Sequence, residues 1–360
     1  MARKKSRRRT IIRRILLALV VGLLFMVGNT LYVAGVFRSI KPHFAGTEKS
    51  VAILGGAEDI TIDQTTGIAY VSADQRRATF QDKKNPVQGT IYWVDLNNPA
   101  QAPVNMLPDF KKDFHPHGIY FYRAKSGKQL LFAVNHAEKN TIQSIERFEV
   151  QGKKLVHLNT IQHELMTSPN DVVAVGENEF YVTNDHGFTK GFGRTLEEYL
   201  RLPLGYVNYY DGKTMKTVSS NITYANGINV SPDGKKLYLA SPSTRRVLIF
   251  DRKADNSIEK VTSVAIGTAG DNIELDAQGN LWLGCHPQML KYAAHAKDSK
   301  KKSPSQAIKI TVKGDNQYEV SEIYMNDGTS LSGSSVAAVY KNNLLVGGVY
   351  DRKFLWCKMK

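Results

Sequence analysis

The sequence is poor in cysteine and lacks the signatures of several large enzyme classes. Only Cys285 and Cys357 occur in 360 residues, so a disulfide-dense scaffold is excluded, although a single bridge stays open. The G-x-S-x-G elbow of serine hydrolases is missing, because the nearest segment, Gly333 to Ala337, lacks the closing glycine. Long helical periods are missing as well. A serine triad and an all-helical body are therefore not expected.

Acidic residues are absent from the first fourteen positions, which hold a large share of the positive charge. The net charge is +15, and eight basic residues lie in this stretch: Arg3, Lys4, Lys5, Arg7, Arg8, Arg9, Arg13 and Arg14. The remainder is only mildly basic and shows no helix-turn-helix, zinc finger or RNP motif. We therefore expect no nucleic-acid partner.

An uncharged apolar segment follows the basic cluster. Ile15 to Val36 is interrupted only by Asn29 and Thr30, and as a helix it would span about 33 Å. A cleavable signal peptide is the alternative, with cleavage near Val33 to Gly35, but the long run favours an uncleaved single-pass anchor. The positive-inside rule then predicts a cytoplasmic segment over 1–14, an anchor over 15–36, a linker over 37–50 and a large domain over 51–360. That domain would be periplasmic, extracellular or lumenal.

The large domain repeats one local pattern six times, a turn with glycine or asparagine followed by a short apolar run. The six turns begin at Gly67, Gly127, Asn178, Gly234, Gly279 and Asn343. Their spacing of about 45–65 residues is slightly longer than a four-stranded propeller blade requires. The pattern predicts an all-β fold, a six-bladed β-propeller. A sandwich with repeated hairpins is the alternative, but it gives no reason for so regular a period.

Polar residues occur in register about eight to ten positions before each turn, where the innermost strand of each blade would run. They are Glu58-Asp59, His117-Gly118-Ile119, Asn170-Asp171, Asn226-Gly227, Asp271-Asn272 and Ser334-Ser335. In a propeller these positions face one central axis. Buried polar groups without partners cost roughly 2–7 kcal/mol each, so they must share a ligand. A ring of carboxylate and amide oxygens without thiolates predicts calcium.

The charges of this ring indicate two cations. Neighbouring strand residues point to opposite faces, so each pair would serve two different ions. One set (Glu58, Asn170, Asn226 and Asp271) and the other (Asp59 and Asp171) carry two negative charges each. Each set would neutralise one Ca²⁺. A polar, water-filled channel without metal is the alternative.

At these residues the sequence resembles the paraoxonase/arylesterase family over about Gly55 to Leu355. The matching segments include Glu58-Asp59, Pro116 to Ile119, Val134 to His136, Asn170 to Gly176, Thr183 to His186, Ala225 to Asn229, Ser231 to Lys235, Asp271 to Ile273, Leu281 to Pro287 and Gly333 to Ala337. The resemblance implies a membrane-anchored hydrolase with two Ca²⁺ ions in a six-bladed propeller. Its substrates would be small lactones and aryl esters, with calcium polarising the carbonyl while a histidine-activated water attacks.

The resemblance also implies roles for single residues. Glu58, Asn170, Asn226, Asp271 and Asn272 would hold the catalytic calcium, and Asp59, Asp171 and the carbonyl of Ile119 would hold a structural one. His117 and His136 match the histidine pair proposed to activate water. Tyr224, Val349 and Tyr350 would line the substrate pocket. Asp185 and His186 either orient a neighbour or only line the tunnel.

Two departures from the family pattern stand out. Cys357 matches a cysteine that family members commonly pair with one near the start of the propeller, but residues 42–51 contain none, so Cys357 should be a free thiol. The segment Asp74 to Arg77 makes the pocket rim more polar and basic than expected. Two alternatives stay open: another propeller enzyme, gluconolactonase-like or strictosidine-synthase-like, and a non-catalytic binding propeller.

Overall fold

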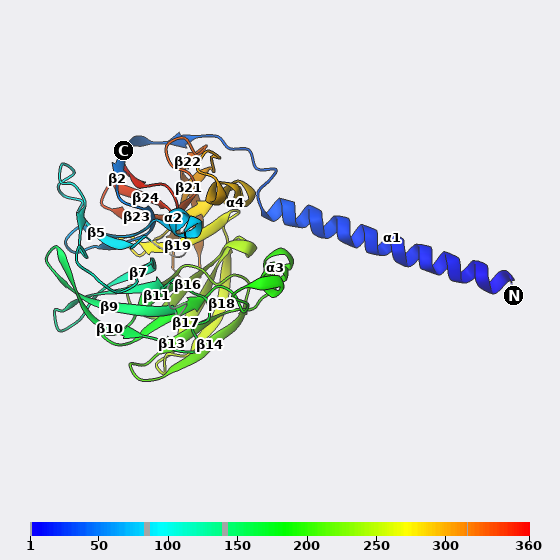
Figure 1. The fold of residues 1–360 in the computed structure, drawn as a ribbon, viewed down its shortest axis with the longest axis horizontal. Helices are drawn as coiled ribbons and strands as arrows, with labels where there is room; N and C mark the ends of the chain where they lie inside the picture. Colours follow the sequence, from blue (N-terminus) through cyan, green and yellow to red (C-terminus); the bar gives the residue numbers. More distant parts are fainter. Residues whose placement is uncertain (1, 83–86, 139–142, 315) are drawn as a thin grey trace.

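The chain consists of a strand-rich domain and one long helix that projects from it (Figure 1). The computed structural model describes residues 2–82, 87–138, 143–314 and 316–360. The helix α1 covers Ala2–Val33. Its segment Thr10–Val33 is apolar and long enough to cross a membrane, and no other helix in the described residues meets these criteria.

Six antiparallel sheets form the domain, one for each predicted turn. The first three blades, each given from the inside outward, are β3 (Gly56–Asp63), β4 (Ile68–Asp74), β5 (Thr90–Asp95) and β6 (Val104–Asn105); β7 (Pro116–Arg123), β8 (Gln129–His136), β9 (Gln143–Gln151) and β10 (Lys154–Ile161); and β11 (Pro169–Ala174), β12 (Phe180–Asn184), β13 (Gly205–Tyr210) and β14 (Met215–Ile222). Every predicted turn in this half joins the first strand of a blade to the second.

The other three blades repeat the same order. They are β15 (Ile228–Val230), β16 (Lys236–Ser241), β17 (Arg246–Arg252) and β18 (Ile258–Ala265); β19 (Ala269–Leu275), β20 (Leu281–His286), β21 (Ser305–Val312) and β22 (Tyr318–Asn326), extended by β1 (His43–Phe44); and β23 (Ser334–Tyr340), β24 (Asn343–Gly348), β25 (Lys353–Met359) and β2 (Gly46–Ala52). The six-bladed propeller is thus confirmed, and the sandwich alternative is wrong.

The ring is closed by strand pairing. β2, from the start of the domain, pairs antiparallel with β25, from its end, and Glu48 stands opposite Cys357. Both cysteines are free and buried, as predicted for Cys357. The predicted linker over 37–50 is wrong for its second half. His43–Phe44 and Gly46–Ala52 are strands, because the fifth and sixth blades use them as outer strands.

The core lies between neighbouring blades. Six buried apolar clusters form it, and each joins two blades. Between the last and first blades, for example, Val336 and Phe354 pack with Ile60 and Val71. This apolar packing leaves the axis to the polar residues of the innermost strands. These strands are β3, β7, β11, β15, β19 and β23, and each of them contacts the next around the ring.

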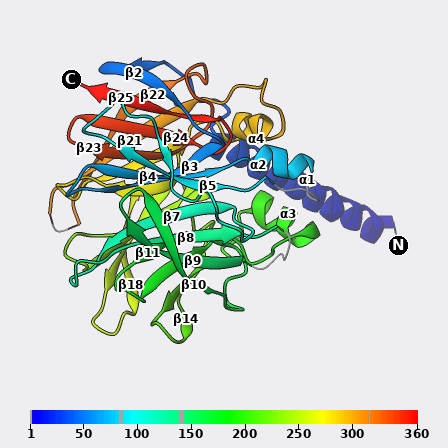
Figure 2. The ribbon, with the colours of Figure 1, turned by 60° about the vertical axis from the view of Figure 1, so that its left-hand side comes forward.

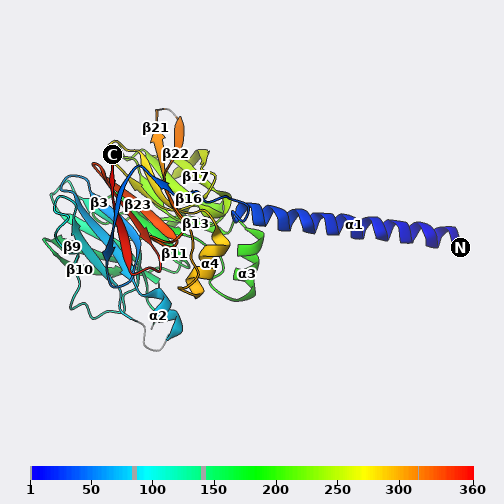
Figure 3. The same cartoon turned by 90° about the horizontal axis from the view of Figure 1, so that it is seen from above.

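Short helices cover one face of the propeller. They are α2 (Arg76–Gln81), α3 (Gly191–Leu200) and α4 (Met289–Lys297), and Figure 2 shows them on the side from which α1 leaves. A single 3-10 turn, η1, covers Pro242–Thr244. In Figure 3, α3 and α4 lie next to the propeller end of α1.

The end of α1 is attached to the propeller. The helix stops at Val33, three residues before the predicted end of the anchor, and Gly35 takes a φ of +71° against the carbonyl of Pro287. The amide of Met289 donates to the carbonyl of Ala34 at an N···O distance of 2.9 Å. Arg38 forms an ion pair with Glu322 at 2.8 Å. These contacts hold the helix end beside the face that carries α3 and α4.

Candidate active site and metal centre

The polar pairs of the innermost strands lie at irregularities in the strand pairing. The register shifts between Ala57 and Asp59 in β3, between Pro169 and Val172 in β11, and between Gly270 and Ile273 in β19. A bulge re-aims the side chains beside it. The simple alternation of faces expected from sequence therefore does not govern these pairs, and Asp271 and Asn272 need not point to opposite faces.

Two glycines let adjacent innermost strands approach each other at the same level. A Cβ on Gly118 would lie 2.2 Å from Oδ1 of Asp171, and one on Gly227 would lie 2.4 Å from the carbonyl oxygen of Asp271. Side chains at either position would push the polar residues apart. The glycines in His117-Gly118 and Asn226-Gly227 thus have a steric role.

The side chains predicted for the catalytic calcium are all buried, and contacts link several of them. Nδ2 of Asn272 donates to Oε1 of Glu58 at 3.1 Å, and Nε2 of His286 bonds to Oδ2 of Asp271 at 2.8 Å. Burial raises the pKa of Glu58 to about 8; Arg76 opposes this shift and Asp271 adds to it. The site therefore holds carboxylates in a place that disfavours their charge unless a cation is near.

Four side-chain oxygens in this group are buried and lack a hydrogen-bond partner among the described residues. They are Oε2 of Glu58 and the Oδ1 atoms of Asn170, Asn226 and Asn272. An unsatisfied buried acceptor costs about 1–3 kcal/mol. The three amide oxygens can only accept, as can the Glu58 oxygen when it is ionised, so a cation that prefers oxygen ligands fits them. The described residues contain no cluster of three or more His, Cys, Asp or Glu side chains that could hold a metal, because amide oxygens make up most of this set.

The residues predicted for the structural calcium form a second buried group. Oδ2 of Asp59 accepts from the amide of Ile119 at 2.7 Å, and Oδ2 of Asp171 accepts from the amide of Ile228 at 2.7 Å. Each aspartate thereby ties its blade to the next one. Burial raises the pKa of both carboxyls well above the usual value. The charge of Glu58 raises the pKa of Asp59 further, and the charge of Asp59 raises the pKa of Asp171 further.

Glu274 is a further acid near this second group, and the sequence interpretation missed it. It is buried, and burial followed by the charges of Asp59 and Asp171 raises its pKa well above the usual value. It stands two residues after Asn272, on the strand period that would keep both on one face. This two-residue spacing from Asn272 is the feature of the sequence that could have identified Glu274.

The two predicted catalytic histidines lie together. The rings of His117 and His136 stack with centroids 4.7 Å apart and an interplanar angle of 12°. Nε2 of His117 is 3.4 Å from Oε1 of Glu58, while Nε2 of His136 donates to the carbonyl of Pro169 at 2.8 Å. Burial and Arg76 lower the pKa of His136 to about 4, and burial, Arg76 and His136 hold the pKa of His117 well below its usual value.

Two other histidine–aspartate pairs line the site. Nδ1 of His186 is 2.8 Å from Oδ1 of Asp185, and the His186 ring meets Tyr224 edge-on at 4.6 Å. His286, bonded to Asp271, stacks on Tyr292 at 3.9 Å. The sequence interpretation did not assign His286 or Tyr292. His286 lies in the matching segment Leu281 to Pro287, but Tyr292 comes from α4 and had no signal in the sequence.

The predicted substrate-pocket residues lie on the face that carries the short helices. Tyr350 is 5.9 Å from Tyr292, ring to ring, and the carbonyl of Val349 approaches Gly56 so closely that a Cβ there would overlap it. Tyr224 takes a φ of +54°. Tyr224 thus contacts His186, and Tyr350 contacts Tyr292, which stacks on His286.

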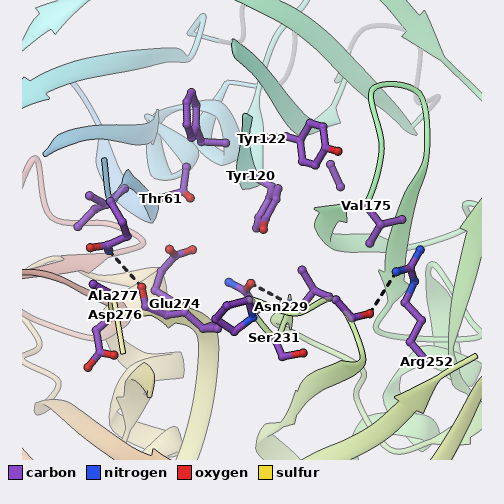
Figure 4. Close-up of a pocket in the computed structure, with 18 residues that line it drawn as sticks. Thr61, Tyr120, Tyr122, Val175, Asn229, Ser231, Arg252, Glu274, Asp276 and Ala277 are labelled. Atoms are coloured by element: carbon purple, nitrogen blue, oxygen red, sulfur yellow. Dashed lines mark hydrogen bonds between the residues drawn. The ribbon is translucent and has the colours of Figure 1, made fainter. Parts of the chain in front are cut away.

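A separate cavity of about 400 Å³ lies further along the same innermost strands (Figure 4). Figure 4 shows Tyr120, Asn229 and Glu274 around it. Tyr120 directly follows Ile119, Asn229 lies three residues after Asn226, and Glu274 lies two after Asn272, so this cavity is further along the tunnel, away from the histidine pair. None of the predicted site residues lines it.

Comparison with known proteins assigns the propeller domain to a family. Residues 51–359 match the protein family described as Arylesterase. The chain is 34% identical to serum paraoxonase/arylesterase 1 of Homo sapiens over 309 residues, which cover 84% of this chain and 86% of that protein. It is 36% identical to serum paraoxonase/arylesterase 2 of Gallus gallus and 33% identical to serum paraoxonase/lactonase 3 of Homo sapiens, each over 84% of this chain and 86% of that protein.

Solved structures of more distant proteins share the fold. A luciferin-regenerating enzyme superimposes with a TM-score of 0.54 at 15% identity and covers 88% of this chain and 97% of its own. A putative gluconolactonase superimposes with a TM-score of 0.52 at 15% identity and covers 89% and 94%. At this identity the likeness concerns the fold alone.

Proposed function

Because the chain belongs to the paraoxonase/arylesterase family and is a hydrolase of that type, we propose that it opens lactones and hydrolyses aryl esters with two calcium ions bound in its tunnel. The observation that carries this proposal is the set of four unpartnered buried oxygens beside the stacked histidines. A dry, metal-free channel would leave these oxygens without a partner among the described residues, at a cost of about 1–3 kcal/mol each.

The residues of the first group would hold the catalytic ion: Glu58, Asn170, Asn226, Asp271 and Asn272. When bound there, calcium supplies a positive charge that polarises the substrate carbonyl and stabilises the oxyanion. His286 keeps Asp271 oriented through its 2.8 Å hydrogen bond. Asp59, Asp171 and the carbonyl of Ile119 would hold the structural ion, since each carboxylate oxygen that accepts one amide still has a second lone pair.

The histidine pair would move the proton of the attacking water. The bond to Pro169 places a proton on Nε2 of His136, so its Nδ1 is the basic nitrogen. In His117, Nδ1 is buried without a partner in the described part of the chain, while Nε2 faces Glu58. His117 is therefore the better placed base, and His136 supports its ring by stacking.

The domain would act outside the cytoplasm. The basic cluster precedes the apolar span Thr10–Val33, which favours a cytoplasmic N-terminus for residues 1–14 and an extracytoplasmic propeller. Either an uncleaved anchor or a signal sequence is consistent with this span. The attachment of Ala34 and Arg38 to the propeller supports retention, because the helix end is part of the folded domain.

A substrate panel on the full-length protein in detergent tests the proposal. We expect turnover of a neutral γ-lactone and of phenyl acetate with calcium, loss of both with chelator, and recovery when calcium is returned. Asn226→Ala removes one unpartnered oxygen and should lower turnover at least about 10- to 100-fold, as changes around metal sites do. Turnover that survives prolonged chelation would refute the role of calcium.

A further inference from the structure

Four of the twelve residues that line one cavity are basic, and one of them, Arg76, also lines a smaller cavity with His136. The first cavity has a volume of about 620 Å³, and its charged lining residues are Arg76, Arg77, Arg352 and Lys353 against one acid, Asp351. It also includes Tyr350, one of the predicted substrate-pocket residues. Its position links it to the proposed active site, and its charge differs from that of the acidic tunnel.

The one acid of this cavity is already engaged. Oδ1 of Asp351 lies 3.2 Å from Nε2 of His295, and Oδ2 accepts from the amide of Ser332 at 2.9 Å. Arg77 is engaged too, since Nη2 donates to the carbonyl of His295 at 2.8 Å and the guanidinium lies 5.1 Å from the centre of the Tyr350 ring. One carboxylate against four basic side chains leaves the cavity with an excess of positive charge.

Among the basic residues of this cavity, Arg76 is the one best placed to bind a ligand. Its side chain is only 15% exposed, and Nη2 donates to the carbonyl of Pro116 at 3.2 Å. Oδ2 of Asp74 is 3.9 Å from its Nε, beyond hydrogen-bond distance, and Oδ1 of Asp74 bonds to Nδ1 of His115 at 3.1 Å. Nε of Arg76 is buried with no hydrogen-bond partner among the described residues. A buried donor of this kind needs an acceptor.

Arg76 also lies between the basic cavity and the reacting groups. It lines a second, smaller cavity together with His136 and His115. A substrate whose carbonyl is beside the stacked histidine pair would place its other end within reach of Arg76.

We propose that the natural substrate is an ester or lactone that carries an anionic group, a carboxylate or a phosphate, and that Arg76 binds this group in the basic cavity. The inference rests on the proposed hydrolase function and specifies its substrate class. A guanidinium binds either anion through two parallel hydrogen bonds, which a neutral substrate cannot accept in the same way. Arg352 and Lys353 add charge at the exposed side of the cavity.

Matched pairs of substrates test the proposal on the full-length protein with calcium. For carboxylate, 5-oxotetrahydrofuran-2-carboxylate is compared with its neutral amide; for phosphate, 4-acetoxyphenyl phosphate is compared with phenyl acetate. We expect a higher kcat/KM for the anionic member of at least one pair. Arg76→Gln should lower the anionic-to-neutral ratio of that pair about 10- to 100-fold, the effect of losing a charge-assisted hydrogen bond. Arg76→Lys should keep part of the ratio, because it retains the charge without the fork.

The controls separate the anion site from the rest of the protein. Arg246→Gln changes an exposed arginine on β17 that bonds to Ser263, and it should leave the ratio unchanged. Arg352→Gln lowers the cavity charge without touching the buried guanidinium, so it tests the proposal even if Arg76→Gln does not fold. We expect the anionic-to-neutral ratio to fall about threefold in this variant, and added salt should lower the ratio further. Unchanged ratios in the cavity variants, or a wild-type preference for both neutral substrates, would overturn the proposal. Calcium-dependent turnover of the neutral substrates in the same samples would still support the proposed function.

Discussion

Asp59→Asn should lower the stability of the protein more with calcium than without it. The two oxygens of Asp59 accept from the amides of Ile60, at 2.9 Å, and Ile119, at 2.7 Å. Asparagine keeps the shape and one acceptor but removes the charge. With a cation present, the variant loses an ionic ligand; without one, it loses a buried negative charge that repels Glu58 and Asp171.

The magnitude follows from linkage. A ligand at 100 times its Kd stabilises the folded state by about 2.7 kcal/mol. The propeller has about 310 residues, and an unfolding entropy of about 2.1 cal/mol/K per residue gives a rise in melting temperature of about 4 °C. Asp59→Asn should lose most of this rise. In chelator, the lost amide bond, about 1 kcal/mol, is offset by relief of burial and repulsion, so the two proteins should melt within about 2 °C.

Thermal melts of wild type and Asp59→Asn, each in saturating calcium and in chelator, provide the assay. The expected result is a larger deficit in calcium than in chelator. Asp109→Asn, at an exposed position, should show no deficit in either condition. If Asp59→Asn melts lower by the same amount in both conditions, Asp59 contributes hydrogen bonds but no cation site, and the division into two ions loses its support.

Three further predictions follow from other parts of the chain. His117→Gln should keep its calcium-dependent melting temperature and lose about 10²–10⁴-fold in lactone turnover, and wild-type turnover of this variant would exclude His117 as the base. Burial raises the pKa of Cys357 to about 12 and that of Cys285 well above its usual value. Neither thiol should therefore react with Ellman's reagent in the folded protein, and both should react once it is unfolded. A fast-reacting thiol in the native protein would contradict the buried placement. Protease added outside intact cells or spheroplasts should digest the propeller and spare an N-terminal tag, whereas a freely soluble cytosolic protein would contradict the predicted topology.

The sequence by itself determined the repeating parts of this protein. Six turns at a regular period predict six blades, since each blade is a local unit of antiparallel strands. The polar pairs could be recognised because they interrupt strands that should be apolar. The apolar run Ile15 to Val36 likewise predicted the span, because a membrane sets its length. These features depend on neighbours along the chain, and such neighbours can be read from the sequence.

Only the tertiary structure decided which residues meet across blades. Arg76 from α2 is far in sequence from His286 in β20 and Tyr292 in α4, and none of the three carries a periodic signal. Ring closure joins the two ends of the domain, so residues 46–52 could not be recognised as the last strand of the sixth blade. The bulges at the ligand pairs also arise from packing around the axis, where six strands converge. There the glycine backbones approach the neighbouring strands closely, and the side chains no longer alternate regularly between the two faces.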